Sequence, residues 1–124
     1  MNILAIKTSS AKAKGRKLQQ WVCKRISERF GFPYDQQDDQ CMIHSREMGQ
    51  QGTDVVLRGE ALMRFPFAIE CKNQESMSLV DSVNQARDNL KPPYKYWMLV
   101  HKRKRFKKPI VIMDFDDFLE LYRR

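Results

Sequence analysis

The apolar run Phe67-Ala68-Ile69-Glu70-Cys71-Lys72-Asn73 ends in charged residues, and the earlier run Gly52-Thr53-Asp54-Val55-Val56-Leu57 carries a carboxylate near its start. Short apolar runs rich in β-branched and aromatic residues predict strands. If the two runs form one hairpin, Asp54 and Glu70 meet at its open end, and Glu70 and Lys72 share a face because side chains alternate along a strand. Carboxylate oxygens suit a hard cation such as Mg²⁺, and a neighbouring lysine can orient or activate a water. The pattern therefore predicts phosphodiester hydrolysis.

The carboxylates also admit a purely structural interpretation. An acid beside three apolar residues is costly to bury unless a cation compensates its charge. A bound metal ion is one such cation, and a salt bridge between Asp54 and Lys72 is the alternative. An isolated Glu-x-Lys by itself indicates only exposed charges.

The chain has 124 residues, which is the length of a single domain with one hydrophobic core. It holds 23 Lys plus Arg against 15 Asp plus Glu, a net charge of +8 that favours a polyanionic partner. Residues 1–30 carry eight bases and one acid, residues 31–90 carry ten acids and five bases, and residues 91–108 carry eight bases and no acid. Two basic segments around an acidic centre fit a protein that grips phosphates on either side of a carboxylate site. A solvated charged surface is the plainer alternative.

The run from His101 to Lys108 holds six Lys or Arg residues in eight positions. Such a segment cannot enter a core, so it predicts an exposed loop or hairpin tip that lies along DNA, with a nuclear import signal as the alternative. The candidate nucleic-acid contacts are basic residues of the first helix, of the loop before the hairpin and of this run: Lys14, Arg16, Lys17, Arg46, Lys102, Arg103, Lys104, Arg105, Lys107 and Lys108.

The cysteines and the hydropathy pattern restrict the compartment. Cys23, Cys41 and Cys71 are an odd number at irregular spacing, which favours free thiols in a reducing environment. Cys71 is expected to turn away from the acids and pack as a small hydrophobe. No apolar segment is long enough to cross a bilayer, so no membrane association is expected.

The predicted elements alternate between helices and strands. Met1–Ser10 is expected to be a short strand or a loose tail, and Trp21 and Trp97 are expected in the core. Three helices are predicted, at about Ala11–Phe30, Leu79–Leu90 and Asp117–Tyr122. Gly31 ends the first helix, Ser78 caps the second, and Asp114 or Asp116 caps the third. Strands are predicted at Cys41–His44, Thr53–Arg58, Phe65–Lys72, Tyr96–Val100 and Ile110–Met113, with a turn at Gly59-Glu60. The order α-β-β-β-α-β-β-α predicts an α/β fold with a mixed central sheet flanked by helices.

Gly-x-Asp, followed after a hairpin by an apolar strand that ends in Glu-x-Lys, resembles the PD-(D/E)XK nuclease superfamily, and within it the small Holliday junction resolvases and related phage nucleases. The resemblance covers roughly residues 12–113 and implies a single domain, residues 1–124, with a restriction-endonuclease-like α-β-β-β-α-β core. It further implies a Mg²⁺-dependent endodeoxyribonuclease. In that enzyme Asp54, Glu70 and the main-chain carbonyl of Cys71 hold Mg²⁺ or Mn²⁺, and Lys72 positions or deprotonates the attacking water, which yields a 5'-phosphate and a 3'-hydroxyl.

The sequence departs from the resolvase pattern on the first helix. Many resolvases carry a further metal-directed glutamate there, where this chain has Gln19 and Gln20. Either Gln20 stands in, or Glu47 reaches over from the loop before the hairpin, or a single metal binds. Gln85 matches a helix glutamine of nucleases similar to the bacterial recombination helicase-nuclease, although Asn89 stands where those nucleases have an aromatic residue.

The resemblance also suggests partners and a location. It implies branched or otherwise structured DNA as the substrate, a homodimer, and the cytoplasm of a bacterial or phage-infected host cell. The alternatives are a restriction-type or nicking endonuclease, a nucleic-acid-binding protein of the same fold without catalysis, and a small anti-host or regulatory protein that binds a protein partner.

Overall fold

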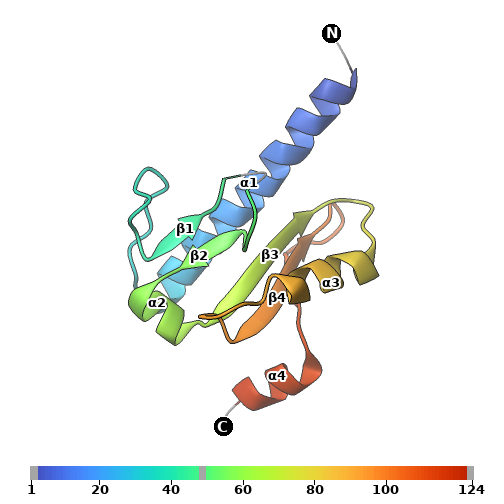
Figure 1. Ribbon diagram of the computed structural model, residues 1–124. Helices are drawn as coiled ribbons and strands as arrows, with labels where there is room; N and C mark the ends of the chain where they lie inside the picture. Colours follow the sequence, from blue (N-terminus) through green and yellow to red (C-terminus); the bar gives the residue numbers. More distant parts are fainter. Residues whose placement is uncertain (1–2, 48–49, 123–124) are drawn as a thin grey trace.

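A five-stranded mixed sheet forms the centre of the molecule (Figure 1). The computed structural model describes residues 3–47 and 50–122. Strands β1 (Ile43–Ser45), β2 (Val55–Leu57), β3 (Phe67–Asn73), β4 (Tyr96–Lys102) and β5 (Ile110–Ile112) lie in the order β1-β2-β3-β4-β5. Neighbouring strands are antiparallel except β3 and β4, which are parallel. The predicted class, an α/β fold with a mixed sheet flanked by helices, is confirmed.

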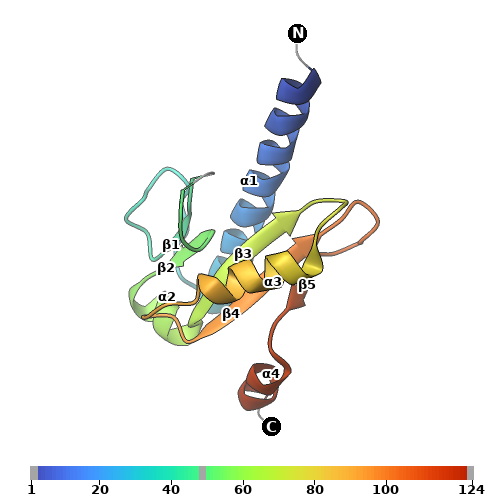
Figure 2. The same ribbon diagram turned by 45° about the vertical axis from the view of Figure 1, so that its right-hand side comes forward.

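Two helices cover opposite faces of this sheet (Figure 2). Helix α1 (Ile3–Phe30) packs against β1, β2 and β3, and its N-terminal half extends beyond the sheet, whereas α3 (Leu79–Asp88) packs against β3 and β4. The short helix α2 (Gly59–Arg64) joins β2 to β3, and α4 (Phe115–Leu121) projects from the end of β5. The parallel pair β3 and β4 requires the crossover through α3, which fixes α3 over the sheet.

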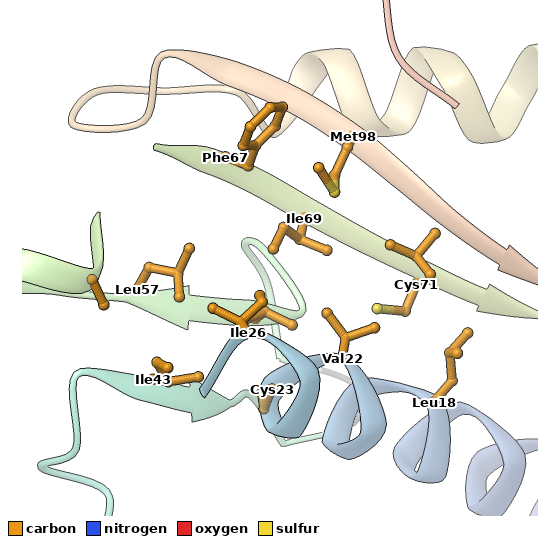
Figure 3. Packing of buried hydrophobic residues seen from close by; sticks show 13 residues of the cluster. Leu18, Val22, Cys23, Ile26, Ile43, Leu57, Phe67, Ile69, Cys71 and Met98 are labelled. Carbon is orange, nitrogen blue, oxygen red and sulfur yellow. The ribbon is translucent and has the colours of Figure 1, made fainter. Parts of the chain in front are cut away.

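The main core lies between α1 and the strands (Figure 3). Leu18, Val22 and Ile26 recur at one helical turn and face the sheet, where Ile69 and Cys71 of β3 meet them. Alternation along β3 therefore sends residues 69 and 71 toward α1 and residue 70 toward α3. The expectation that Cys71 packs as a small hydrophobe is confirmed, and burial raises the pKa of its thiol well above the ordinary value.

Several sequence signals act as expected. Helix α1 ends where Gly31 adopts a φ of 79°, and its amide donates to the Ser27 carbonyl at 2.8 Å. Ser78 caps α3 by accepting a hydrogen bond from the Asp81 amide at 3.3 Å. Strands β2 and β3 pair antiparallel with Val55 opposite Ile69, so the predicted hairpin pairing is confirmed.

Three expectations about local structure were wrong. Residues 3–10 are helical rather than a strand or a tail, because the chain has neither Gly nor Pro before Gly15 and is rich in Ala and Lys. The segment at Gly59-Glu60 is the start of helix α2, not a turn. Trp21 was expected in the core but is 43% exposed, because α1 covers β1 to β3 and leaves β4 and β5 open on that side. Trp97 is buried, as predicted.

The exposed part of the basic run His101–Lys108 also begins later than expected. His101 and Lys102 belong to β4, and His101 is buried rather than part of an exposed loop. The His101 ring explains this, because its Nδ1 donates to the Lys72 carbonyl at 3.0 Å and its Nε2 accepts from Arg103 Nε at 2.9 Å. The exposed tip of the β4–β5 hairpin starts after this pair.

Candidate active site

Asp54 and Glu70 come together where β2 begins and β3 approaches its end. The Asp54 amide donates to the Ile69 carbonyl at 2.9 Å, and the Asp54 carboxylate accepts from the Cys71 amide at 2.7 Å. These two bonds hold Asp54 against β3, and Asp54 and Glu70 line one hollow together. The Lys72 ammonium acts electrostatically on both acids. The structure thus gathers the three side chains that the sequence singled out.

The environment of the two acids disfavours their joint ionisation. Burial and, after it, the neighbouring Asp54 charge raise the pKa of Glu70 to about 8, against the opposing effects of Asn89 and Lys72. Burial also raises the pKa of Asp54, although the Cys71 amide, Lys72 and Arg46 favour its charged form. Two buried carboxyls in contact need either a shared proton or a cation. The pair is therefore suited to binding a metal ion.

Asn89 holds the Glu70 carboxyl from α3, on the face of the sheet toward which Glu70 points. It lies at the C-terminal cap of α3, and its Nδ2 donates to Glu70 Oε1 at 2.6 Å. A donor at this distance orients the carboxyl and favours its ionised form. The sequence marks Asn89 only as a residue that stands in place of an expected aromatic, and it gives no sign of this hydrogen bond.

The amide on α1 that faces the acids belongs to Gln19, not to Gln20. Gln19 is 3% exposed, accepts a hydrogen bond from Ser45 Oγ at 3.0 Å, and lines a hollow of about 140 Å³ together with Asp54, Glu70 and Lys72. Gln20 is turned by about 100° around the helix axis and does not line this hollow. The expectation that Gln20 stands in for the helix glutamate is corrected accordingly.

A larger hollow of about 920 Å³ opens on the α3 side of the acids. Asp54 and Glu70 line it together with Gln85 and Asn89, and Gln85 borders the smaller hollow as well. Gln85 therefore borders both hollows, and its side chain is exposed. A space of this size accommodates a substrate of several atoms across, such as a nucleotide unit.

Glu47 does not join the two acids. It lines separate hollows with Arg46, away from Asp54 and Glu70. In the described part of the chain, no group of three or more His, Cys, Asp or Glu side chains is placed to hold a metal. Two carboxylates nevertheless match Mg²⁺, which binds proteins through one or two carboxylates and keeps several waters. The donor set fits this ion, with Gln19 as the nearest amide.

Basic segments lie at the same end of the sheet as the acids. Asn73, at the end of β3, donates to the Lys14 carbonyl at 3.4 Å, which places this turn of α1 beside the site. The Lys104 amide donates to Glu75 Oε2 at 2.7 Å, which ties the β4–β5 tip to the loop after β3. Exposed bases on these two segments include Lys14, Arg16, Lys17, Lys104, Arg105, Lys107 and Lys108.

Three of the predicted DNA contacts also have partners within the chain. The Lys102 ammonium donates to the carbonyls of Arg103 and Phe106 and so closes the hairpin tip. Arg103 donates to His101, and Arg46 Nε donates to the Thr53 carbonyl at 2.6 Å. These side chains shape the loops that carry the exposed bases.

Comparison with known proteins adds no relative: no protein-family model, curated protein or solved structure matches this chain. Within residues 3–47 and 50–122, no helix combines the length and the apolar character needed to cross a membrane.

Proposed function

We propose that this protein is a metal-dependent endonuclease of the PD-(D/E)XK type, with a restriction-endonuclease-like core, that hydrolyses phosphodiester bonds in DNA. The observation that carries the proposal is that Asp54, Glu70 and Lys72 line one hollow, with Asp54 held against β3 by the Cys71 amide. Two buried carboxyls side by side need a shared proton or a cation, and the three residue types match the chemistry of phosphodiester hydrolysis.

Each residue has a distinct role in this proposal. Asp54, Glu70 and the main-chain carbonyl of Cys71 hold Mg²⁺ or Mn²⁺. The bound cation supplies Lewis-acid activation of the phosphate and lowers the pKa of water. Lys72 positions the attacking water and offsets the negative charge that develops on the phosphate. Asn89 keeps the Glu70 carboxyl oriented, and Gln19 borders the site from α1.

The charge distribution supports a nucleic acid as the substrate. Exposed bases on α1 and on the β4–β5 tip lie at the same end of the sheet as the acids. A polyanion that follows these bases passes the carboxyl pair. We assign branched DNA as the substrate class, and a homodimer as the acting species, because of the resemblance to small Holliday junction resolvases.

A nucleic-acid-binding protein of this fold without catalysis is the second candidate. The observation that favours it is Gln19, a neutral amide at the turn of α1 where many resolvases carry a glutamate. Both candidates predict DNA binding, and only the first predicts cutting that requires a divalent cation.

The test is cleavage of labelled four-way junction, duplex and single-stranded DNA with Mg²⁺, Mn²⁺ or EDTA. We expect the wild type to cut, with a preference for the junction, and Asp54→Asn and Lys72→Ala to lose cutting while they still bind DNA in EDTA. Glu60→Gln, which neutralises an exposed acid on α2, is the matched control and should cut normally. Cutting that persists in Asp54→Asn contradicts the proposed site, and a wild type that binds DNA but never cuts it supports the second candidate.

A further inference from the structure

His101 joins the end of β3 to the tip of the β4–β5 hairpin. Its side chain is 3% exposed, and its ring lies between two polar groups. Nδ1 lies 3.0 Å from the carbonyl oxygen of Lys72, and Nε2 lies 2.9 Å from Nε of Arg103. Because the Arg103 guanidinium can only donate, Nε2 is the acceptor and Nδ1 carries the proton. The ring therefore donates to the strand that carries Lys72 and accepts from an arginine.

The main chain of Arg103 is held as well as its side chain. Its carbonyl accepts hydrogen bonds from the Lys102 ammonium at 2.6 Å and from the Phe106 amide at 3.0 Å. The Phe106 ring packs edge-on against the His101 ring, with centroids 5.4 Å apart. These contacts fix the turn at the hairpin tip, so Arg103 has little freedom left to lose when it binds a ligand.

A neutral acceptor orients a guanidinium without cancelling its charge. Arg87 shows the opposite case, because the Asp114 carboxylate pairs with it at 2.7 Å and compensates its charge. In the described part of the chain, no ion pair involves Arg103, and the nearby acid Glu75 is bonded to the main chain of the tip. The bond to His101 uses Nε, which leaves the two Nη groups of Arg103 for an anionic ligand such as a phosphate.

The sheet places this guanidinium close to the proposed site. Strands β3 and β4 are parallel, with Lys72 directly opposite His101. Neighbouring strands lie about 4.8 Å apart, so Arg103, which follows β4, lies beside the end of β3. Lys72 lines the smaller hollow together with the two acids. A DNA strand with one phosphate in that hollow therefore brings a neighbouring phosphate toward Arg103.

We propose that His101 is a positioning residue for DNA cleavage. It presets the Arg103 guanidinium to bind the phosphate next to the one that is cut, and its other hydrogen bond joins that guanidinium to the strand end that carries Lys72. Phosphate binding at the hairpin tip is thereby transmitted to the residue beside the attacking water. The inference rests on the proposed function, because it assigns His101 a role within that reaction.

Single-turnover cleavage of the labelled junction, together with DNA affinity measured in EDTA, tests this role. His101→Asn keeps a donor for the Lys72 carbonyl but is too short to accept from Arg103, whereas His101→Gln keeps an acceptor that reaches it. Arg103→Lys lies outside the core and keeps the charge without the planar fork. We expect His101→Asn and Arg103→Lys each to cut about tenfold more slowly, with DNA affinity within about twofold of the wild type. His101→Gln should recover most of the rate.

A double variant distinguishes one shared link from two independent defects. Both changes break the same hydrogen bond, so His101→Asn combined with Arg103→Lys should cut no more slowly than either variant alone. Arg105→Lys makes the same substitution two residues further along the tip, and its effect should add to that of His101→Asn. Additive effects in both pairs, or slow cutting explained by an equal loss of DNA affinity, would overturn the proposal.

The nitrogen resonances of the histidine rings test the link without any cutting. His101→Asn removes one of the two ring systems and so assigns the signals of His101 and His44. Near neutral pH, His101 should show a proton on Nδ1, and junction DNA in EDTA should shift its Nε2 signal in the wild type but not in Arg103→Lys. A wild type that shows this shift but never cuts contradicts the proposed function and leaves the phosphate link in place. A wild type that cuts while the His101 signals stay unchanged overturns the link and leaves the proposed function, and a protein that binds no DNA overturns both.

Discussion

The main-chain amide of Cys71 donates a 2.7 Å hydrogen bond to the carboxylate of Asp54, a residue 17 positions earlier in the chain. The backbone of β3 thereby fixes the position of an acid that lies just outside β2. An asparagine at position 54 keeps an oxygen that accepts this bond and removes the charge, whereas an alanine leaves the Cys71 amide without its partner. Asp54→Asn is therefore the variant that isolates the charge.

The raised pKa of Glu70 predicts a specific dependence of stability on pH. In the unfolded chain this acid ionises near its ordinary value of 4.5, and in the folded protein its pKa is about 8. Between these values the folded state holds the extra proton, so the free energy of unfolding falls as pH rises toward 8 and levels off above it. Urea titrations at pH 5 and pH 8 without divalent cations measure this loss.

Glu70→Gln should abolish most of that dependence. We expect the variant to be more stable than the wild type at pH 8 by about 2 kcal/mol. Each pKa unit is worth about 1.4 kcal/mol, and the coupled Asp54 carboxyl accounts for part of the pKa shift, so only part of the full value is lost with Glu70. The two proteins should differ little at pH 5. Parallel stability curves for the wild type and Glu70→Gln would show that Glu70 ionises normally.

Asn89 should act as a positioning residue for Glu70. Removing its donor with Asn89→Ala disfavours the ionised carboxyl, so the rising limb of the pH–rate profile for cleavage should move upward by roughly one pH unit. Asn84→Ala is the matched control, because Asn84 lines the same larger hollow but is not the donor to Glu70. If the profile of Asn89→Ala coincides with that of the wild type, the 2.6 Å contact has no catalytic consequence.

Gln19 and Gln20 give a direct test of the geometry on α1. A carboxylate at position 19 enters the hollow shared with Asp54 and Glu70, so Gln19→Glu should bind Mn²⁺ about tenfold more tightly than the wild type. Gln20→Glu adds the same charge one residue away and should leave the affinity nearly unchanged. Calorimetric titration of both variants measures the difference, and equal affinities would mean that position 19 does not reach the cation.

The exposed tip of the β4–β5 hairpin should contribute to DNA binding through phosphates. Replacing Lys104 and Arg105 by Ala should weaken binding to every sequence and reduce the slope of log K against log salt by about 2, since each lost phosphate contact removes about 0.9. The control pair, Arg64→Ala with Lys95→Ala, removes exposed bases at the opposite end of β3 and β4. An equal change of slope in both pairs would reject a defined path for the DNA.

The acids of the site were predictable because they depend on local rules. Alternation along β3 places Glu70 and Lys72 on one face, and the short connection to β2 makes Asp54 a neighbour. The same alternation places Cys71 in the core. These features need only the strand period and one hairpin.

The rest of the site depends on how distant elements pack. The stripe of Leu18, Val22 and Ile26 places both Gln19 and Gln20 beside the buried face, and only the direction in which α1 crosses the sheet selects Gln19. Asn89 reaches Glu70 because the crossover places the end of α3 over β3. Neither relation leaves a local pattern in the sequence.

Burial of the basic and aromatic residues was also set by tertiary contacts. His101 belongs to a run that is otherwise exposed, yet its ring pairs with the Lys72 carbonyl and is buried. Trp21 continues the apolar stripe of α1 but borders an apolar groove over β5. Composition predicts the charge of a segment better than it predicts which side chain the fold covers.

Titration with Mn²⁺, followed by calorimetry or by electron paramagnetic resonance, tests the central claim that Asp54 and Glu70 together bind a divalent cation. The wild type should bind at a site that strengthens as pH rises toward 8, because protons compete for the carboxyls. Asp54→Asn and Glu70→Gln should each weaken binding by at least about tenfold, whereas Lys72→Ala should not weaken it. A wild type that binds no Mn²⁺, or either acid variant binding it as tightly as the wild type, would contradict the account.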